Sequence, residues 1–273
     1  KMMFLSINRL SQYNKDGYIC FDNIINKKNC PKIIKIVRNF QSKNKFNNKL
    51  DRNHPFSNIS DNYDKVVILD QKNNDKLDKL IDFKKIEKIA SFLSKTEMNI
   101  WFRKFYPKHS FDGDNEFYHQ DYAYHKDKDA KNKEYIQCFI SLENHFVESG
   151  CLRVFKGSHK LGLIKHHTVM TRNGVSKLTP SSSTLKKISK KNKLKSLELK
   201  AGSCVFFNYN LIHGSSSNAS QYDQLRMVVQ LIKKKNNRSK KKNNNVWKNR
   251  NLKEIKILQK MINLKRKLGQ ARN

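Results

Sequence analysis

Apolar residues in the first part of the chain recur at helical spacing, interrupted by a sharp turn at Asp16-Gly17. Pro31 falls where the first turn of a second helix would begin, a position that suits its fixed backbone angle. We therefore expect residues 1–98 to be mainly helical. The predicted elements are a helix before Asp16, a strand over 18–21, a helix from Asn29 to Phe40 and a helix over 77–93.

From residue 99 onward the apolar residues form short runs or alternate with polar ones, and Gly, Asn and Ser separate the runs. This pattern is typical of short antiparallel strands, and their number indicates a barrel or jelly roll. We expect the preceding helices to cover one face of the sheet, which gives a mainly β fold with flanking helices. The predicted strands are 100–106, 117–122, 135–142, 150–155, 197–199, 203–208 and 225–232.

Two polar segments interrupt or follow the predicted strands. Residues 165–196 are rich in Ser, Thr and Lys, and a stretch of this length is either a lid over a site or a disordered surface insertion. Residues 233–273 begin as a Lys/Asn-rich run, and a basic helix over 246–268 would dock on the domain or meet a partner. We expect one catalytic domain over 1–232, with its β core over 99–232, and a basic tail.

The formal net charge of +34 suggests nucleic acid or an anionic surface as a partner. However, 46 of the 57 basic residues are lysines, and asparagine and isoleucine are also abundant. An A/T-rich coding sequence produces this composition on any protein surface. The charge alone therefore does not favour a nucleic-acid partner, although the tail carries 16 basic residues and one acidic residue.

The five cysteines are far apart and form no Cys-x-x-Cys pair, so neither a disulfide framework nor a zinc cluster is predicted. No stretch approaches the roughly 20 apolar residues of a membrane span, and the apolar part of the N-terminus is short for a secretory signal. The expected location is the cytoplasm.

A histidine and an aspartate lie two residues apart in His119-Gln120-Asp121. On a strand, this spacing directs both side chains to one face, about 6 to 7 Å apart, and Gln120 to the other. His213 ends a later apolar strand, which an antiparallel barrel can bring beside the first pair. Two imidazoles and one carboxylate on one side of a metal form the ligand set of non-haem Fe(II) oxygenases. We therefore expect His119, Asp121 and His213 to be metal ligands and the catalytic centre.

Some oxygenases of this type use a 2-oxoacid as a cosubstrate. Where that acid carries a second carboxylate, far from the metal, the protein needs a cation to bind it. Arg226 lies on a predicted strand whose apolar neighbours Leu225 and Met227 face the opposite way. The face that carries Arg226 is either solvent or the lumen of a barrel. In the lumen, a guanidinium would bind a carboxylate through two hydrogen bonds, which lysine cannot do.

Several motifs occur along the chain in a fixed order. They are Asp16-Gly17-Tyr18, His119-Gln120-Asp121-Tyr122-Ala123-Tyr124, residues 149–160 (SGCLRVFKGSHK), residues 201–207 (AGSCVFF), His213-Gly214-Ser215, Asn218-Ala219-Ser220 and Arg226. Through these motifs the chain resembles the phytanoyl-CoA dioxygenase family of Fe(II)/2-oxoglutarate oxygenases. The resemblance runs from about Leu10 to about Ile232.

The resemblance implies a double-stranded β-helix fold, iron bound by His119, Asp121 and His213, and 2-oxoglutarate and O2 as cosubstrates. It also implies that Arg226 binds the far carboxylate of 2-oxoglutarate. Ser215 and Gln137 are further candidates for cosubstrate binding. The interval between His213 and Arg226 is slightly longer than is common in the family.

Within the family, halogenases carry a small residue in place of the metal-binding carboxylate. Because Asp121 is present, oxidation is favoured, with hydroxylation of a small organic substrate and release of succinate and CO2. We expect His159, in Gly157-Ser158-His159, to be a structural turn residue. No metal-binding role is expected for five further histidines, which are His109, His125, His145, His166 and His167.

Two other functions remain open from the residues alone. A basic nucleic-acid-binding protein without catalysis would bind through its tail with a steep dependence on salt. A metal-dependent hydrolase would need neither oxygen nor 2-oxoglutarate.

Overall fold

The computed structural model describes residues 5–45, 67–68, 75–111, 115–124, 134–170 and 176–234. Its helices are α1 (Ile7–Asp16), α2 (Cys30–Lys45), α3 (Asp75–Asp78), α4 (Phe83–Ser94) and α5 (Ser182–Lys191), with 3-10 turns η1 (Lys27–Asn29), η2 (Asp121–Tyr124) and η4 (Ser158–Leu161). Its strands are β1 (Tyr18–Phe21), β2 (Val67–Ile68), β3 (Met98–Lys108), β4 (Glu116–His119), β5 (Tyr135–Ser141), β6 (Leu152–Phe155), β7 (His167–Met170), β8 (Ser176–Thr179), β9 (Leu194–Leu197), β10 (Cys204–Asn208), β11 (His213–Ser215) and β12 (Gln224–Lys233).

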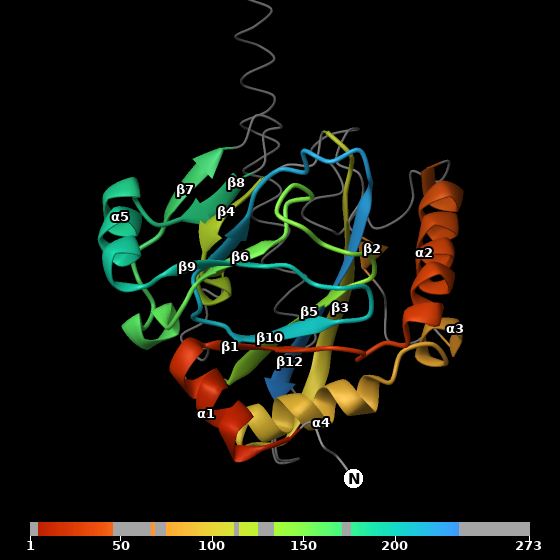
Figure 1. The fold of residues 1–273 in the computed structure, drawn as a ribbon, viewed down its shortest axis with the longest axis horizontal. Coiled ribbons are helices and arrows are strands. Elements are labelled where there is room, and N and C mark those ends of the chain that lie inside the picture. The colour runs from red at the N-terminus through yellow and green to blue at the C-terminus, as the bar shows by residue number, and fades with distance from the viewer. Residues whose placement is uncertain are drawn as a thin grey trace, which may run out of the picture.

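The strands form two main antiparallel sheets and a hairpin (Figure 1). The larger sheet has the order β1-β10-β5-β12-β3-β2, and the smaller one has the order β4-β11-β6-β9. Apolar side chains from the inner faces of both sheets form one cluster, which includes Phe139 and Val228 from the larger sheet and Leu152 and Val154 from the smaller one. This arrangement confirms the predicted jelly-roll core.

The helices cover the outer face of the larger sheet, as predicted. In Figure 1, α1 and α4 cross beneath this sheet and α2 stands beside it. Their apolar residues join one core with the outward side chains of β5, β10 and β12. The ends of α1 follow from the sequence, because the Ser6 hydroxyl accepts a hydrogen bond from the Arg9 amide and Gly17 ends the helix at φ 80°.

Three sequence predictions need correction. The helix predicted over 77–93 is divided into α3 and α4, because the Asp82 carboxylate accepts a hydrogen bond from the Lys85 amide at 2.9 Å and begins a new helix. The strand predicted over 117–122 ends at His119. Residues 165–196 carry regular structure, namely the hairpin β7–β8 and the helix α5, in their described part.

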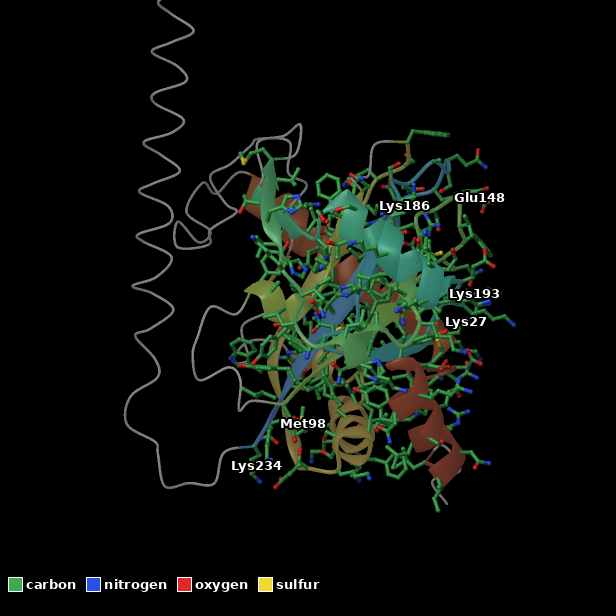
Figure 2. The ribbon with its side chains drawn as sticks, turned by 90° about the vertical axis from the view of Figure 1, so that its left-hand side faces the viewer. Lys27, Met98, Glu148, Lys186, Lys193 and Lys234 are labelled. Atoms are coloured by element: carbon green, nitrogen blue, oxygen red, sulfur yellow. The ribbon has the colours of Figure 1, made fainter. Side chains whose placement is uncertain are left out.

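The basic tail lies outside the described residues, apart from its first two lysines. None of the helices in the described ranges is long and apolar enough to cross a lipid bilayer. Figure 2 labels four exposed lysines: Lys27 in η1, Lys186 in α5, Lys193 between α5 and β9, and Lys234 directly after β12.

Candidate metal centre

The three predicted ligands meet at one end of the smaller sheet. His119 ends β4 and pairs in register with His213, the first residue of β11. Asp121 Oδ1 lies 3.5 Å from His119 Nε2 and 3.8 Å from His213 Nε2. One ligand atom from each of the three side chains lies within 4.8 Å of the other two, so the group could hold a metal ion.

The geometry that brings His119 and Asp121 together differs from the predicted one. Asp121 is not on the strand but opens the turn η2. The residue between them, Gln120, is completely buried. Its amide nitrogen donates to the carbonyls of Gly162 and Asn210, both at 2.7 Å, and its amide oxygen accepts from the Ile164 amide at 2.9 Å. Gln120 thus ties the chain to two other loops at the point where it turns Asp121 towards the histidines.

Both imidazoles are oriented by backbone carbonyls. The Nδ1 atom of His119 lies 2.7 Å from the Phe117 oxygen, and that of His213 lies 3.0 Å from the Leu211 oxygen. A proton on Nδ1 satisfies each carbonyl and leaves the Nε2 lone pair directed to the common centre. Such a partner for the second ring nitrogen is usual for metal-binding histidines.

The electrostatics of the centre favour a carboxylate between two imidazoles. Burial raises the pKa of Asp121, but the two histidines, His213 and His119, favour its charged form more strongly and lower this pKa to about 2. Burial and the nearby His119 lower the pKa of His213 to about 4, so this ring is neutral near pH 7. Burial opposes the charged form of His119, but its hydrogen bond to Asp121 and the nearby carboxylates raise its pKa.

One atom of the centre lacks a partner. Asp121 Oδ2 is buried and has no hydrogen-bond partner among the described residues. A buried carboxylate oxygen left in this way is costly unless a cation binds it. Two imidazole nitrogens and a carboxylate on one side of a common point fit Fe(II) with open positions opposite.

His213 is positioned by a turn, whereas the sequence predicted that it ends a strand. The strand β10 ends at Asn208, and the chain then crosses to the other sheet, where β11 begins at His213. The Ser158 hydroxyl, fully buried, accepts a hydrogen bond from the Ile212 amide at 2.9 Å. The Phe155 amide donates to the Ile212 oxygen, also at 2.9 Å. Both backbone groups next to the ligand are therefore fixed.

His159 has the predicted role of a turn residue. It lies in η4, and its Nε2 atom lies 3.2 Å from the Asn14 oxygen. A methyl group added at Gly17 would collide with the His159 ring, so the two motifs that contain these residues pack against each other. His159 thus joins η4 to the end of α1.

Arg226 lies on the inner face of β12, the second of the two alternatives that the sequence left open. Its neighbours Leu225 and Met227 face the outer core beneath the helices. The guanidinium of Arg226 lies 5.9 Å from the centre of the Phe139 ring, which belongs to the inner cluster. Gln137 lies on the same face as Phe139, and its side-chain oxygen is buried without a partner among the described residues.

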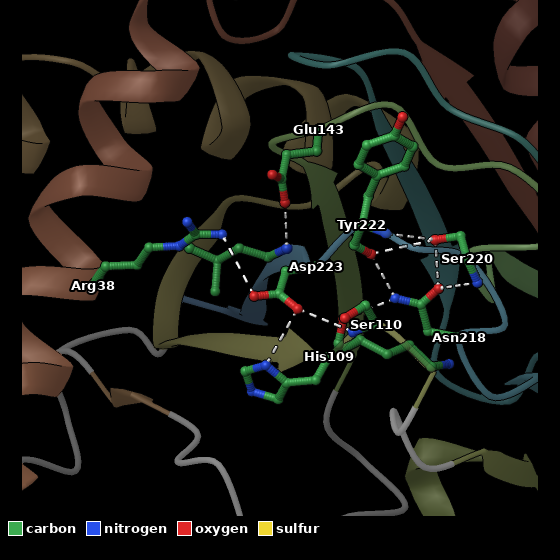
Figure 3. A network of polar contacts seen from close by, with 10 residues as sticks. Arg38, His109, Ser110, Glu143, Asn218, Ser220, Tyr222 and Asp223 are labelled. Atoms are coloured by element: carbon green, nitrogen blue, oxygen red, sulfur yellow. Dashed lines mark hydrogen bonds and ion pairs between the residues drawn. The ribbon is translucent and has the colours of Figure 1, made fainter.

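The long interval between His213 and Arg226 is filled by an ordered loop (Figure 3). The buried Asn218 amide donates to the carbonyls of Lys108 and Tyr222 at 3.1 and 2.8 Å. Asp223 accepts from the Ser110 amide at 3.0 Å, and its carboxylate lies 3.4 Å from His109 Nδ1. These bonds set the position from which β12 starts.

Two basic residues on the inner face of β3 were not predicted from the sequence as part of the site. Lys108 is buried and donates to the Ser215 hydroxyl at 2.8 Å. Lys104 lies with its ammonium 4.5 Å from the centre of the Tyr106 ring, and burial lowers its pKa although Asp121 acts in the opposite direction. No sequence signal separates them from the other lysines except their positions on the strand.

The hairpin β7–β8 lies beside the metal centre. Lys177 is paired with Glu116 at 3.0 Å, and the Leu178 amide donates to the Tyr124 hydroxyl at 3.0 Å. The Tyr124 ring meets the His119 ring edge to face at 5.6 Å. The segment 165–196 therefore borders the site, and its movement as a lid stays a prediction.

Comparison with proteins of known structure supports the fold. EctD from S. alaskensis, in a crystal structure with 2-oxoglutarate and 5-hydroxyectoine, matches with a TM-score of 0.64 and 18% identity over 83% of this chain and 75% of that chain. EvdO2 from Micromonospora carbonacea var. aurantiaca, complexed with 2-oxoglutarate, matches with a TM-score of 0.62 and 15% identity over 84% of this chain and 91% of that chain. The carbocyclase SnoK from nogalamycin biosynthesis, described as non-heme and alpha ketoglutarate dependent, matches with a TM-score of 0.62 and 15% identity over 84% of this chain and 85% of that chain.

Sequence comparison gives the family. A "Phytanoyl-CoA dioxygenase" of Arabidopsis thaliana is 37% identical over 82 residues, which are 30% of this chain and only 27% of that relative. None of these comparisons supports the nucleic-acid-binding alternative. The sequence profile described as "Phytanoyl-CoA dioxygenase (PhyH)" matches residues 13–228, and this match includes all three candidate ligands and Arg226. The chain therefore belongs to the phytanoyl-CoA dioxygenase family.

Proposed function

We propose that the protein is an Fe(II)- and 2-oxoglutarate-dependent dioxygenase that hydroxylates a small organic substrate, with release of succinate and CO2. The observation that carries the proposal is the convergence of His119, Asp121 and His213 in a chain of this family. Bound Fe(II), together with 2-oxoglutarate and O2, would supply the oxidising power for an unactivated C–H bond.

The chain's own residues would prepare the site for this chemistry. His119 and His213 would bind the iron through Nε2, because their Nδ1 atoms face backbone carbonyls. Asp121 would add a carboxylate and give the otherwise unpartnered Oδ2 a cation. Gln120, fixed by three hydrogen bonds, would hold the turn between the first two ligands in place.

Residues of both sheets would bind the cosubstrate. Arg226 would receive the far carboxylate of 2-oxoglutarate from β12. Ser215 lies two residues past His213 with its side chain buried, and Gln137 has a buried side-chain amide whose NH2 group would donate to the cosubstrate in the same interior. These groups would orient the 2-oxoacid so that its keto end meets the iron.

Hydroxylation is the reaction that we infer, because Asp121 occupies the ligand position that halogenases leave to chloride. Related folds also serve other reactions, as the carbocyclase SnoK illustrates. Since function depends on the lining of the site, product analysis must decide between hydroxylation and another oxidation.

The decisive assay is 2-oxoglutarate turnover coupled to oxygen consumption in the presence of Fe(II). His119→Ala and Asp121→Ala should abolish both the turnover and the binding of Fe(II). His167→Ala, at an exposed histidine of β7, serves as the matched control and should keep both. Full activity of the ligand variants would refute the site, and activity without oxygen and 2-oxoglutarate would indicate a hydrolase.

A further inference from the structure

Lys108 is a buried lysine whose hydrogen bonds all go to neutral oxygens. Its side chain contacts the Ser215 hydroxyl at 2.8 Å, the Gly150 oxygen at 3.4 Å and the Ser216 oxygen. Only 2% of the residue is exposed. Among the residues that the structure describes, no carboxylate forms a hydrogen bond or an ion pair with this ammonium. A buried cation normally has such a partner.

His145 is a second buried basic residue in the same region. It is 1% exposed, and neither of its ring nitrogens has a hydrogen-bond partner in the described part of the chain. Its backbone is fixed by two hydrogen bonds with Leu199, at 2.8 and 3.1 Å. Its ring packs edge to face on Phe139 at 5.8 Å. A buried imidazole with two unused nitrogens is costly unless a ligand uses them.

Phe139 joins these groups to Arg226. The Arg226 guanidinium lies 5.9 Å from the centre of the Phe139 ring, and the same ring contacts His145. In the sheet, Arg226 pairs with Tyr106 on β3, two residues from Lys108 on the same face. Lys108, His145 and Arg226 therefore form one basic cluster inside the molecule.

The electrostatic effects within the cluster agree with this proximity. Burial and the charge of Arg226 lower the pKa of Lys108 to about 6, with Lys177 acting in the same direction and Glu116 and Cys151 against it. Burial, with Arg226 and Lys108, lowers the pKa of His145 to about 3. Glu116 is itself paired with Lys177. Burial and the charge of Arg226 therefore disfavour the charged forms of Lys108 and His145, and a bound anion would reverse this effect.

The position of the cluster suits one end of the cosubstrate. Ser215, which Lys108 contacts, lies two residues beyond the ligand His213 on β11. Two residues of a strand span about 6 to 7 Å, comparable with the length of a five-carbon dicarboxylate chain. A 2-oxoacid that binds the metal through its keto end would therefore place its far carboxylate among these basic groups.

We propose that Lys108 and His145, together with Arg226, form the pocket that binds the far carboxylate of 2-oxoglutarate. This inference rests on the proposed function and adds two binding residues to it. Lys108 donates to the carboxylate as a second cation, and His145 donates from a ring nitrogen. The pocket selects a 2-oxoacid with a second carboxylate over one that lacks it.

The experiment compares two probes on the metal-loaded protein, 2-oxoglutarate and 2-oxopentanoate, in which a methyl group replaces the far carboxylate. Binding is measured by calorimetry in the absence of oxygen and by the rise in melting temperature. Lys108→Met should weaken 2-oxoglutarate binding at least about 30-fold, the loss expected when a buried charge loses its partner, and leave 2-oxopentanoate binding unchanged. Lys186→Met, at an exposed lysine of α5, is the control and should change neither (Figure 2).

His145→Phe tests the same pocket independently and guards against a folding defect in Lys108→Met. It replaces a ring without hydrogen bonds by an apolar ring that can pack on Phe139, so we expect a folded protein with selectively weaker 2-oxoglutarate binding. Unchanged 2-oxoglutarate binding in both variants would overturn the inference. Equal weakening of both probes would also overturn it, because the residues would then act on the metal end. If the wild type binds metal but not 2-oxoglutarate, the proposed function fails instead.

Discussion

Ser158→Ala tests whether the turn at Gly157-Ser158-His159 positions a metal ligand. The hydroxyl of Ser158 is the partner of the Ile212 amide at 2.9 Å, directly before His213. Removal of one partner from a buried donor costs about 1–3 kcal/mol of the free energy of unfolding. The Ile212 amide would then have to seek another acceptor, and His213 would move with it.

We expect two measurable effects of this substitution. Urea unfolding should show the loss of stability of about 1–3 kcal/mol. Calorimetric titration with Fe(II) without oxygen should show an affinity about 10-fold lower, the size of effect seen when groups that orient metal ligands are removed.

Ser189→Ala is the matched control, because this exposed serine of α5 donates only to the Lys186 oxygen, at 2.9 Å. Its effect on stability should stay below about 0.5 kcal/mol, and metal affinity should not change. If Ser158→Ala loses stability but binds metal as tightly as the control, the idea that Ser158 positions His213 is wrong.

Three other predictions concern the same region. Gly17→Ala should cost about 2–4 kcal/mol of stability in urea unfolding, because φ is 80° and the new methyl group meets His159; His159→Ala should recover part of this loss. Because the pKa of Lys108 is about 6 in the free protein, binding of 2-oxoglutarate above pH 6 should take up a proton. The affinity for 2-oxoglutarate should therefore be constant below pH 6 and fall as the pH rises. Calorimetry in buffers of different ionisation enthalpy measures this proton uptake, and Lys108→Met should abolish it. Lys177→Met should speed hydrogen exchange in β8 by breaking the pair with Glu116 at 3.0 Å, and unchanged exchange would show that this pair does not hold the hairpin.

The sequence was sufficient where alternation alone determines the structure. Along β12, apolar residues face the helices and Arg226 lies on the opposite face, as the period of two requires. The sequence left open whether that face is solvent or interior. Likewise Gln137 shares the inner face of β5 with Phe139, opposite Ile136 and Cys138.

The alternation of polar and apolar residues did not predict the structure at the point where β4 ends. Gln120 is buried by bonds to carbonyls and an amide more than 40 positions away, and no local pattern reveals such partners. Other errors had a local signal. Asp82 caps α4, Ser181 caps α5, and Asn208 closes the turn before β11 by accepting from the Leu211 and Asn210 amides.

Lys108 and His145 were unpredictable for a different reason. The sequence contains 46 lysines, and burial alone distinguishes Lys108 from the lysines at the surface. His145 lies outside the group formed by His119, Asp121 and His213. Only the fold shows that it faces Arg226.

The division of the site between two sheets has a mechanical consequence. The metal ligands belong to the smaller sheet and its adjoining turn, whereas Arg226 belongs to the larger sheet. A 2-oxoacid held at one end by the metal and at the other by Arg226 would connect the two sheets. Without this ligand, the two sheets are joined by the apolar cluster between them, and each sheet keeps its own hydrogen-bonded ladder.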